Sequence, residues 1–416
     1  MTDTADVVVV GGGVNGASIA YALAARGAGK VILCEQAALA TGASGRSSAL
    51  VRMHYTNEGD ARLAFASFPV FRHWPEIMGG PPVFTHTGFV NVVAPQYANA
   101  LGKNVAMLRG IGVNTVALTP GELRDLQPFA NVDDIGAAAW EPESGYADPA
   151  ATVDGFARRG AELGARILQW TPVTRILRRE SRVVGVETSA GRIDAGAVVV
   201  AAGAWAPRIC REIGIELPAR PKGIDTVQVT RPPALTAPHV IFIDNVLGTY
   251  FRPESGIRTI VGVPCQEWDL DPDAPLVLAP DAPAVGAQIL THRIPAMDGA
   301  TLARGYRAVD CYSRDRHAIL GRVDGVDGLY LATAFSGSGF KIAPAVGVCM
   351  AELIGRRPRQ DGRHRRIRPA ALRRGKIARG PVSVRDPPRP RGPLTWSQAP
   401  TTLAGRLRRI QCSSEW

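Results

Sequence analysis

Apolar residues fall into short continuous runs and helical repeats over most of the chain. The runs 7–10 and Val31–Cys34 are apolar without alternation, which is typical of strands buried on both faces of a parallel sheet. Between them, Ile19 and Leu23 lie four residues apart, as on one face of a helix. The amino-terminal part is therefore predicted to be a strand-helix-strand unit.

Two later regions continue this pattern. A helix is predicted over 154–163 and another over 344–354, because their apolar residues follow the helical repeat. A strand is expected at 166–170, and a hairpin at 183–200. These segments are typical of further pieces of the same nucleotide-binding unit.

Other regions have a different pattern. Short β-rich stretches occur at 84–93, 240–243, 249–252 and 258–262, separated in part by proline-rich connectors. Such stretches favour an antiparallel sheet. We therefore expect an α/β protein in which a Rossmann-like domain is interleaved with a domain of mainly antiparallel sheet. The expected first domain comprises 1–80, 143–215 and 305–355, and the second comprises 81–142 and 216–304.

Charge is distributed unevenly along the 416 residues. The net charge of +11 arises from the segment 356–416, which holds 17 Lys or Arg and three acidic residues, so the preceding body is slightly acidic. This basic Pro/Arg-rich tail lacks periodic apolar residues, and its composition predicts disorder. Because Trp396 is its only aromatic residue before the carboxyl-terminal Trp416, nucleic acid is not the expected partner.

Other classes of protein are disfavoured by what the pattern lacks. The apolar runs fall short of the roughly 20 residues that span a bilayer, and the amino terminus resembles no secretion signal, so a cytoplasmic protein without a membrane span is expected. The six cysteines and seven histidines are scattered, without metal-ligand spacing. No metal site is expected.

The strongest motif follows the first predicted strand. Gly11, Gly13 and Gly16 form Gly-x-Gly-x-x-Gly at a strand-to-helix turn, with Asn15 inside it. The first glycine permits the tight turn, the second lets the backbone approach a pyrophosphate, and the third permits close helix-strand packing. Glu35 ends the second strand, 19 residues after Gly16, where it can accept hydrogen bonds from ribose hydroxyls. The motif predicts dinucleotide binding but does not distinguish FAD from NAD.

Three further segments carry a resemblance to a known family. They are 41–52, 195–205 and 328–341, of which the last two are buried strands that run into glycine turns. With the first motif, they resemble the FAD-dependent family of glycine oxidase, sarcosine oxidase and D-amino acid dehydrogenase over about residues 5–355. The resemblance implies that the Rossmann-like domain binds FAD and that the interleaved domain binds substrate.

The resemblance also assigns residues to the cofactor. Residues of 44–49 would lie along the pyrophosphate and flavin, Val173 would contact the adenine, and Gly203 would lie beside the adenosine. The start of a helix near residue 340 would face the flavin pyrimidine, where its positive end stabilises charge on reduced flavin. The full set implied at these positions is Ser44, Gly45, Ser47, Ser48, Val173, Gly203, Gly337, Gly339, Phe340 and Lys341.

Four residues are candidates for contact with substrate. Arg52 and Lys341 match the family's carboxylate-binding cations, and a guanidinium pairs with a carboxylate through two hydrogen bonds. Tyr250 and Tyr312 would lie near the flavin and could orient an amine. The implied substrate is a small amine that carries a carboxylate.

The chain also departs from the family pattern. Asp310 stands where some members carry the cysteine that bonds to flavin, with Cys311 one residue later, so noncovalent FAD is expected. The lysine that activates oxygen in sarcosine oxidases would fall at Thr259 or Ile260, which leaves the electron acceptor unknown and makes a dehydrogenase a serious alternative to an oxidase.

The expected reaction is oxidation of a small amino acid or N-methyl amino acid, sarcosine- or glycine-like, by hydride transfer to flavin N5, which gives an imine. Oxidation of a 2-hydroxy acid by the same fold is the main alternative, since a carboxylate clamp serves both substrates. A tRNA-modifying flavoprotein is a further alternative. Partner subunits are also an open expectation, because the run that begins at Gly45 resembles the β subunit of multimeric sarcosine oxidase.

Overall fold

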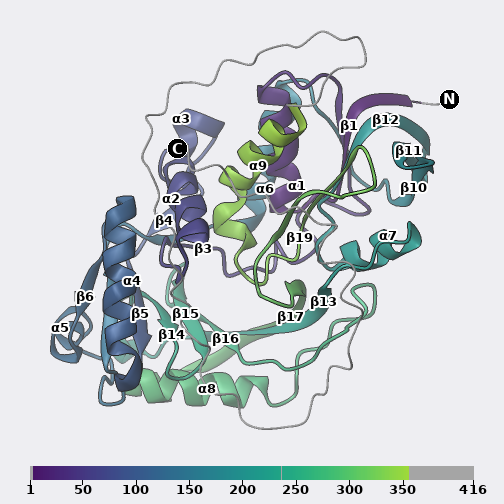
Figure 1. The fold of residues 1–416 in the computed structure, drawn as a ribbon. Coiled ribbons are helices and arrows are strands. Elements are labelled where there is room, and N and C mark those ends of the chain that lie inside the picture. Colours follow the sequence, from purple (N-terminus) through teal and green to yellow (C-terminus); the bar gives the residue numbers. More distant parts are fainter. Residues whose placement is uncertain (1–2, 236, 356–416) are drawn as a thin grey trace.

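The computed structural model describes residues 3–235 and 237–355. Figure 1 shows two layered units. The upper one is a sheet with helices packed on it, and the lower one is a broad curved sheet. The predicted disorder of 356–416 concerns residues outside the described part. Within that part, no helix is both long and apolar enough to cross a membrane.

The first unit is built on a parallel sheet. Its strands lie in the order β9 (Arg166–Leu168), β2 (Val31–Cys34), β1 (Asp3–Val10), β12 (Gly191–Val200) and β19 (Leu329–Thr333). Residues 7–10 and all of β2 are buried, as their continuous apolar runs predicted. The strand predicted at 166–170 is shorter and ends at Leu168, because the chain turns at residues 169–170, where Trp170 adopts a positive φ of 56°.

Antiparallel strands extend this sheet. The predicted hairpin is present as β11 (Arg182–Thr188) and β12, and β10 (Val173–Arg179) pairs with β11. β18 (Ile319–Arg322) pairs with β19. The carboxyl-terminal half of β12 thus stays free to pair with β1 and β19, whose ends form one edge of the site.

Helices cover one face of the sheet. α1 (Val14–Ala25) packs between α6 (Pro149–Glu162) and α9 (Gly339–Gly355), and α2 (Glu58–Arg72), followed by the short α3 (Trp74–Met78), packs against α9. α9 begins at Gly339, five residues before the predicted start at residue 344, because Pro344 lies inside the helix instead of in its first turn. α7 (Ala206–Glu212) contacts β10 instead.

The second sheet is mainly antiparallel, as predicted. Its order is β17 (Thr301–Ser313), β13 (Ala219–Thr230), β16 (Arg258–Val263), β15 (Thr249–Glu254), β14 (Ile241–Asp244), β5 (Phe89–Val93), β7 (Ala137–Glu141) and β6 (Val116–Leu118). β14 and β5 are its parallel pair. α4 (Ala98–Ile111) packs on β7 and β6, α5 (Pro120–Leu126) is capped by Thr119, and α8 (Ala282–Arg293) covers β13 and β16.

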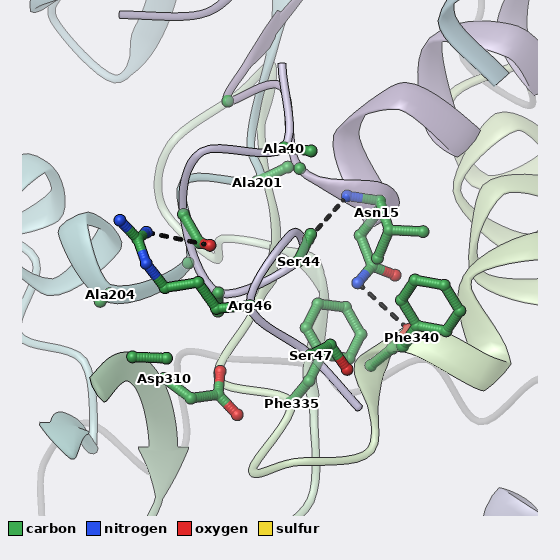
Figure 2. Close-up of a pocket in the computed structure, with 18 of the residues that line it drawn as sticks. Asn15, Ala40, Ser44, Arg46, Ser47, Ala201, Ala204, Asp310, Phe335 and Phe340 are labelled. Atoms are coloured by element: carbon green, nitrogen blue, oxygen red, sulfur yellow. Dashed lines mark hydrogen bonds between the residues drawn. The ribbon is translucent and has the colours of Figure 1, made fainter. Parts of the chain in front are cut away.

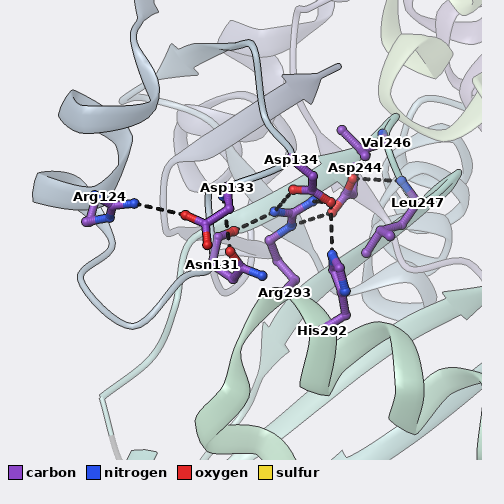
Figure 3. Close-up of polar contacts among 9 residues, drawn as sticks. All are labelled: Arg124, Asn131, Asp133, Asp134, Asp244, Val246, Leu247, His292 and Arg293. Atoms are coloured by element: carbon purple, nitrogen blue, oxygen red, sulfur yellow. Dashed lines mark hydrogen bonds and ion pairs between the residues drawn. The ribbon is translucent and has the colours of Figure 1, made fainter. Parts of the chain in front are cut away.

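A buried ion-pair network joins α8 to the rest of this unit (Figure 3). Arg293, at the end of α8, donates from Nε to Asp244 Oδ2 at 2.7 Å and from Nη1 to Asp134 Oδ1 at 2.7 Å. Both Arg293 and Asp244 are fully buried, so the pairing offsets the cost of removing their charges from water. The network ties the end of α8 to the end of β14.

A small sheet connects the two units. β3 (Leu50–Val51) pairs with β8 (Gly145–Ala147), which also pairs with β4 (Phe84–His86). This sheet places the segment after β3 against both units.

Candidate functional site

A long pocket lies at the carboxyl ends of β1 and β12, between the two units (Figure 2). It encloses about 1750 Å³, including its open mouth. All predicted site residues line it except Gly16 and Gly45. The structure therefore brings together segments from both ends of the chain.

The glycine turn has the geometry that its motif requires. Gly11 has φ of +109°, and a Cβ there would lie 2.6 Å from the carbonyl oxygen of Ala201. A Cβ on Gly16 would lie 1.9 Å from the carbonyl oxygen of Gly11. Gly16 thus packs the helix onto the turn, whereas Gly11 and Gly13 line the pocket.

Two helices begin at the pocket wall. α1 begins after Gly13 with neither a side-chain cap nor an acidic residue in its first turn, and α9 likewise has no acidic residue in its first turn. The nearest atom to a Cβ on Gly13 would be Ser44 Oγ, at 3.0 Å, and that oxygen accepts a hydrogen bond from Val14 N. Figure 2 shows Asn15 beside them, pointing at the start of α9. Both helix ends present positive dipoles to the pocket.

Glu35 lies at the end of β2, as predicted. Its Oε2 accepts from Gly12 N at 2.6 Å, and its Oε1 accepts from Ala37 N at 2.9 Å. Each oxygen keeps capacity for a further donor. The carboxylate is thus oriented at the pocket wall where a ribose would lie.

The segment 41–49 forms a second wall. Gly45 is structural, because its N–H donates to Ala40 O at 2.9 Å and a Cβ would lie 2.3 Å from that oxygen. Ser47 Oγ accepts from Ala49 N, and Ser48 Oγ bonds to the Tyr250 hydroxyl at 3.1 Å. The loop is therefore held by its own hydroxyls and by the second sheet.

The far end of the pocket is lined by Val173 and Gly203. Gly203, in the 3₁₀ turn Gly203–Trp205, has φ of +49° and accepts at its carbonyl from Thr333 Oγ1. Trp205 also lines this end, and its indole N–H donates to Asp273 Oδ1 at 2.6 Å.

Asp310 positions the loop that enters α9. Its Oδ1 accepts from Cys311 N and its Oδ2 from Gly337 N, each at 2.8 Å. Burial raises the pKa of this carboxyl against the effect of these bonds. Gly337 has φ of +84°, so its place in the turn favours glycine.

Strand alternation separates Asp310 from Cys311. Asp310 and Tyr312 line the pocket, whereas Cys311 is buried in the apolar cluster on the other side of β17. Burial raises the pKa of the Cys311 thiol to about 12. Cys311 is therefore poorly placed for a bond to a ligand in the pocket.

Two cations meet at one aromatic ring. The Arg52 guanidinium carbon lies 4.8 Å from the centroid of the Tyr55 ring, and Lys341 Nζ donates to the Tyr55 hydroxyl at 3.2 Å. Burial, followed by the charge of Arg52, holds the pKa of Lys341 well below its usual range. Neither cation has an ion pair with a carboxylate within residues 3–235 and 237–355. An anion in the pocket would satisfy both charges.

The two candidate tyrosines line other walls. Tyr250 lies flat against β16, because Gly262 opposite it has no side chain and a Cβ there would lie 2.3 Å from the ring. Tyr312 contacts Trp268 edge to face.

Thr259 and Ile260, where an oxygen-activating lysine would fall, are buried, and Thr259 Oγ1 is bonded to His239 Nε2 at 2.8 Å. The choice between oxidase and dehydrogenase stays open.

Three residues near the site were not among the predicted set. Tyr55 bridges the two cations, Arg46 lines the pocket and donates to Thr41 O, and Trp205 closes the far end. Arg46 and Trp205 lie within the segments 41–52 and 195–205 that resemble the family, so their position in these segments could have indicated them. Tyr55 gave none, since its role depends on α9.

The residues present fit FAD. The start of α1 suits a pyrophosphate, Glu35 suits a ribose, and the same pocket is also lined by Arg52 and Lys341. Together they define a dinucleotide-binding protein whose pocket also contains two cations.

Comparison with known proteins agrees with this class. The model of a family described as FAD dependent oxidoreductase (DAO) matches residues 6–353. The chain belongs to this family, and it is an FAD-dependent oxidoreductase.

Individual relatives span several activities. The chain is 27% identical to glycine oxidase of Geobacillus kaustophilus over 86% of its length and 94% of that protein. It is 26% identical to 4-methylaminobutanoate oxidase (formaldehyde-forming) of Paenarthrobacter nicotinovorans over 83% of its length, but spans only 43% of that protein. Among solved structures, L-proline dehydrogenase from P. horikoshii matches with a TM-score of 0.78 and 28% identity, covering 85% of this chain and 94% of that one.

Proposed function

We propose that the protein oxidises a small amino acid or N-methyl amino acid at a carbon attached to nitrogen. The observation that carries the proposal is the pair of cations at Tyr55, which have no carboxylate partner among the described residues. A substrate carboxylate would lie between Arg52 and Lys341 and offset both charges. Bound FAD would supply the electron sink, with N5 as hydride acceptor.

The chain's own residues would orient the substrate. Arg52 can donate two hydrogen bonds in one plane, which restricts rotation of the carboxylate and directs the adjacent carbon into the pocket. A bound anion would raise the pKa of Lys341, which opposes the effect of burial and favours the charged form. Tyr250 and Tyr312 line the remaining walls, and their hydroxyls can accept from an amine.

The choice of an amine over a 2-hydroxy acid rests on the relatives. Glycine oxidase, 4-methylaminobutanoate oxidase and L-proline dehydrogenase are named for substrates that carry both nitrogen and a carboxylate. We also propose that FAD is held without a covalent bond, since Asp310 instead of Cys311 lines the pocket.

The test is anaerobic reduction of the flavin by a panel of substrates. Glycine, sarcosine, L-proline and 4-methylaminobutanoate represent amines, glycolate and lactate represent hydroxy acids, and methyl esters of the amines are matched controls without the anion. We expect loss of flavin absorbance with at least one amine and at least about tenfold slower reduction by its ester. Reduction by the hydroxy acids alone, or equal reduction by acid and ester, would refute the proposal.

A further inference from the structure

The segment 52–54 follows β3 and is held from the second sheet by a buried carboxylate. Glu141, the last residue of β7, is fully buried, and its Oε2 accepts from Met53 N at 2.9 Å and from Ser144 Oγ at 2.6 Å. Met53 N–H is a backbone donor outside any strand ladder. Glu141 therefore fixes the backbone of the residue that follows Arg52.

Register places a second support beside the first. Phe89 of β5 lies directly opposite Glu141 in the antiparallel pair, so both side chains share one face of the sheet. The Arg52 guanidinium carbon lies 5.5 Å from the centroid of the Phe89 ring. The same face thus holds both the backbone and the side chain of the clamp.

The charges in this region are incompletely satisfied. Glu141 Oε1, Arg52 Nε and His54 Nδ1 are buried, and none has a hydrogen-bond partner in the described part of the chain. Arg52 Nη1 donates to His54 O, and His54 Nε2 is bonded to Asn104 Nδ2 at 2.9 Å. Burying a carboxylate in such surroundings is costly unless a nearby cation offsets it.

The charge of Arg52 has a minor effect on Glu141. Burial raises the pKa of the Glu141 carboxyl, while the hydrogen bonds from Ser144 and Met53 and the charge of Arg52 lower it. A neutral group could accept the Met53 hydrogen bond at less cost. The link from Glu141 to Arg52 is therefore the hydrogen bond to Met53 N.

We propose that Glu141 is a positioning residue that holds Arg52 at the pocket wall in the orientation that receives the substrate carboxylate. This inference rests on the proposed function, because it takes Arg52 as the carboxylate clamp. Glu141 does not line the pocket and acts only through the segment 52–54. Its contribution therefore disappears when the guanidinium is absent.

The test is a double-mutant cycle on the FAD-loaded enzyme, with acetate as the probe and the change in flavin absorbance as the binding signal. Glu141→Ala is expected to raise the acetate dissociation constant about tenfold with FAD retained, since the Met53 anchor is lost. In the Arg52→Met background the same change is expected to add less than about twofold. Glu141→Gln keeps an acceptor for Met53 N and is expected to recover affinity to within about threefold of the native enzyme.

Controls separate positioning from general damage. Glu143→Ala makes the same chemical change as Glu141→Ala two residues along the chain, at a residue paired with Arg72 on the surface, and is expected to leave acetate binding unchanged. If Glu141→Ala fails to retain FAD, Glu141→Asp takes its place in the cycle, because it keeps the charge but is too short to reach Met53 N.

Additive effects in the double variant, or unchanged acetate binding in Glu141→Ala, would overturn the positioning role. Native acetate binding in Arg52→Met would instead refute the proposed clamp, so the two failures are distinguishable.

Discussion

Asn15 Nδ2 donates to the carbonyl oxygen of Gly339 at 3.3 Å, which joins the first turns of α1 and α9. The two helices also cross closely, because Ser18 Oγ donates to Ala343 O at 2.8 Å and a Cβ on Gly347 would lie 2.4 Å from that hydroxyl oxygen. The two helix starts that face the pocket are therefore fixed relative to each other. A cofactor bound at the start of α1 would therefore have a fixed position relative to the start of α9.

Replacement of the second motif glycine tests this cradle. Gly13→Val is expected to abolish FAD retention, because the isopropyl group would occupy the space beside Ser44 where a pyrophosphate approaches the backbone. Flavin content of the purified protein is the measurement. Gly102→Val, where a Cβ meets nothing within 4 Å, is the control and should remain yellow. Normal flavin content in Gly13→Val would show that the pyrophosphate of FAD does not approach the backbone at Gly13.

Acid precipitation tests the mode of FAD attachment. The flavin is expected to appear entirely in the supernatant, because Cys311 points away from the pocket and Asp310 stands on its wall. Absorbance of the pellet and the supernatant measures this. Flavin that stays with the pellet would show a covalent bond.

Most of the first unit was predictable from sequence because its signals are local. The turn at Gly11, the acid at Glu35 and the buried run of β1 each follow from a few neighbouring residues. The antiparallel character of the second sheet was predictable in the same way.

The surroundings of Arg52 were not predictable, since they depend on pairing between distant segments. Glu141 reaches Met53 only because β7 pairs with β5, and Tyr55 meets Lys341 only because α2 packs on α9. The spacing of residues along the chain does not predict these contacts. The low pKa of Lys341 likewise follows from burial in the folded protein.

Carboxylate binding is expected to depend on pH through Lys341. Burial and then Arg52 lower its pKa, whereas Asp60 and Asp310 raise it less, and a bound anion would raise it further. Binding therefore takes up a proton, and acetate affinity should fall by up to about tenfold per pH unit above the lowered pKa of the free site. Acetate titrations from about pH 6 to 9 measure this slope. The same pH dependence of acetate affinity in Lys341→Met would show that Lys341 is not its source.

Stability is expected to fall in mild acid because two buried histidines must charge on unfolding. Burial, aided by Arg52, lowers the pKa of His54 from 6.5 to about 3, and burial lowers the pKa of His239 to about 4. Below pH 6.5 the unfolded chain binds more protons than the folded one, so stability is lost as pH falls towards these values. Urea unfolding should show up to about 1.4 kcal/mol lost per pH unit and histidine.

The control for this prediction is a single substitution. His54→Gln should make the dependence of unfolding free energy on pH shallower between about pH 6 and 5, since one of the two titrating groups is gone. A slope that matches the native protein would show that His54 is not a source of the acid sensitivity.

The central claim is that Arg52 holds a substrate carboxylate, and anaerobic single-turnover reduction of the flavin in Arg52→Met tests it most directly. Methionine roughly preserves the volume of the side chain but removes its donors. With the substrate found in the panel, kcat/KM is expected to fall about 30- to 1000-fold, or about 2 to 4 kcal/mol, with FAD still bound. An unchanged reduction rate and unchanged apparent affinity would contradict the account.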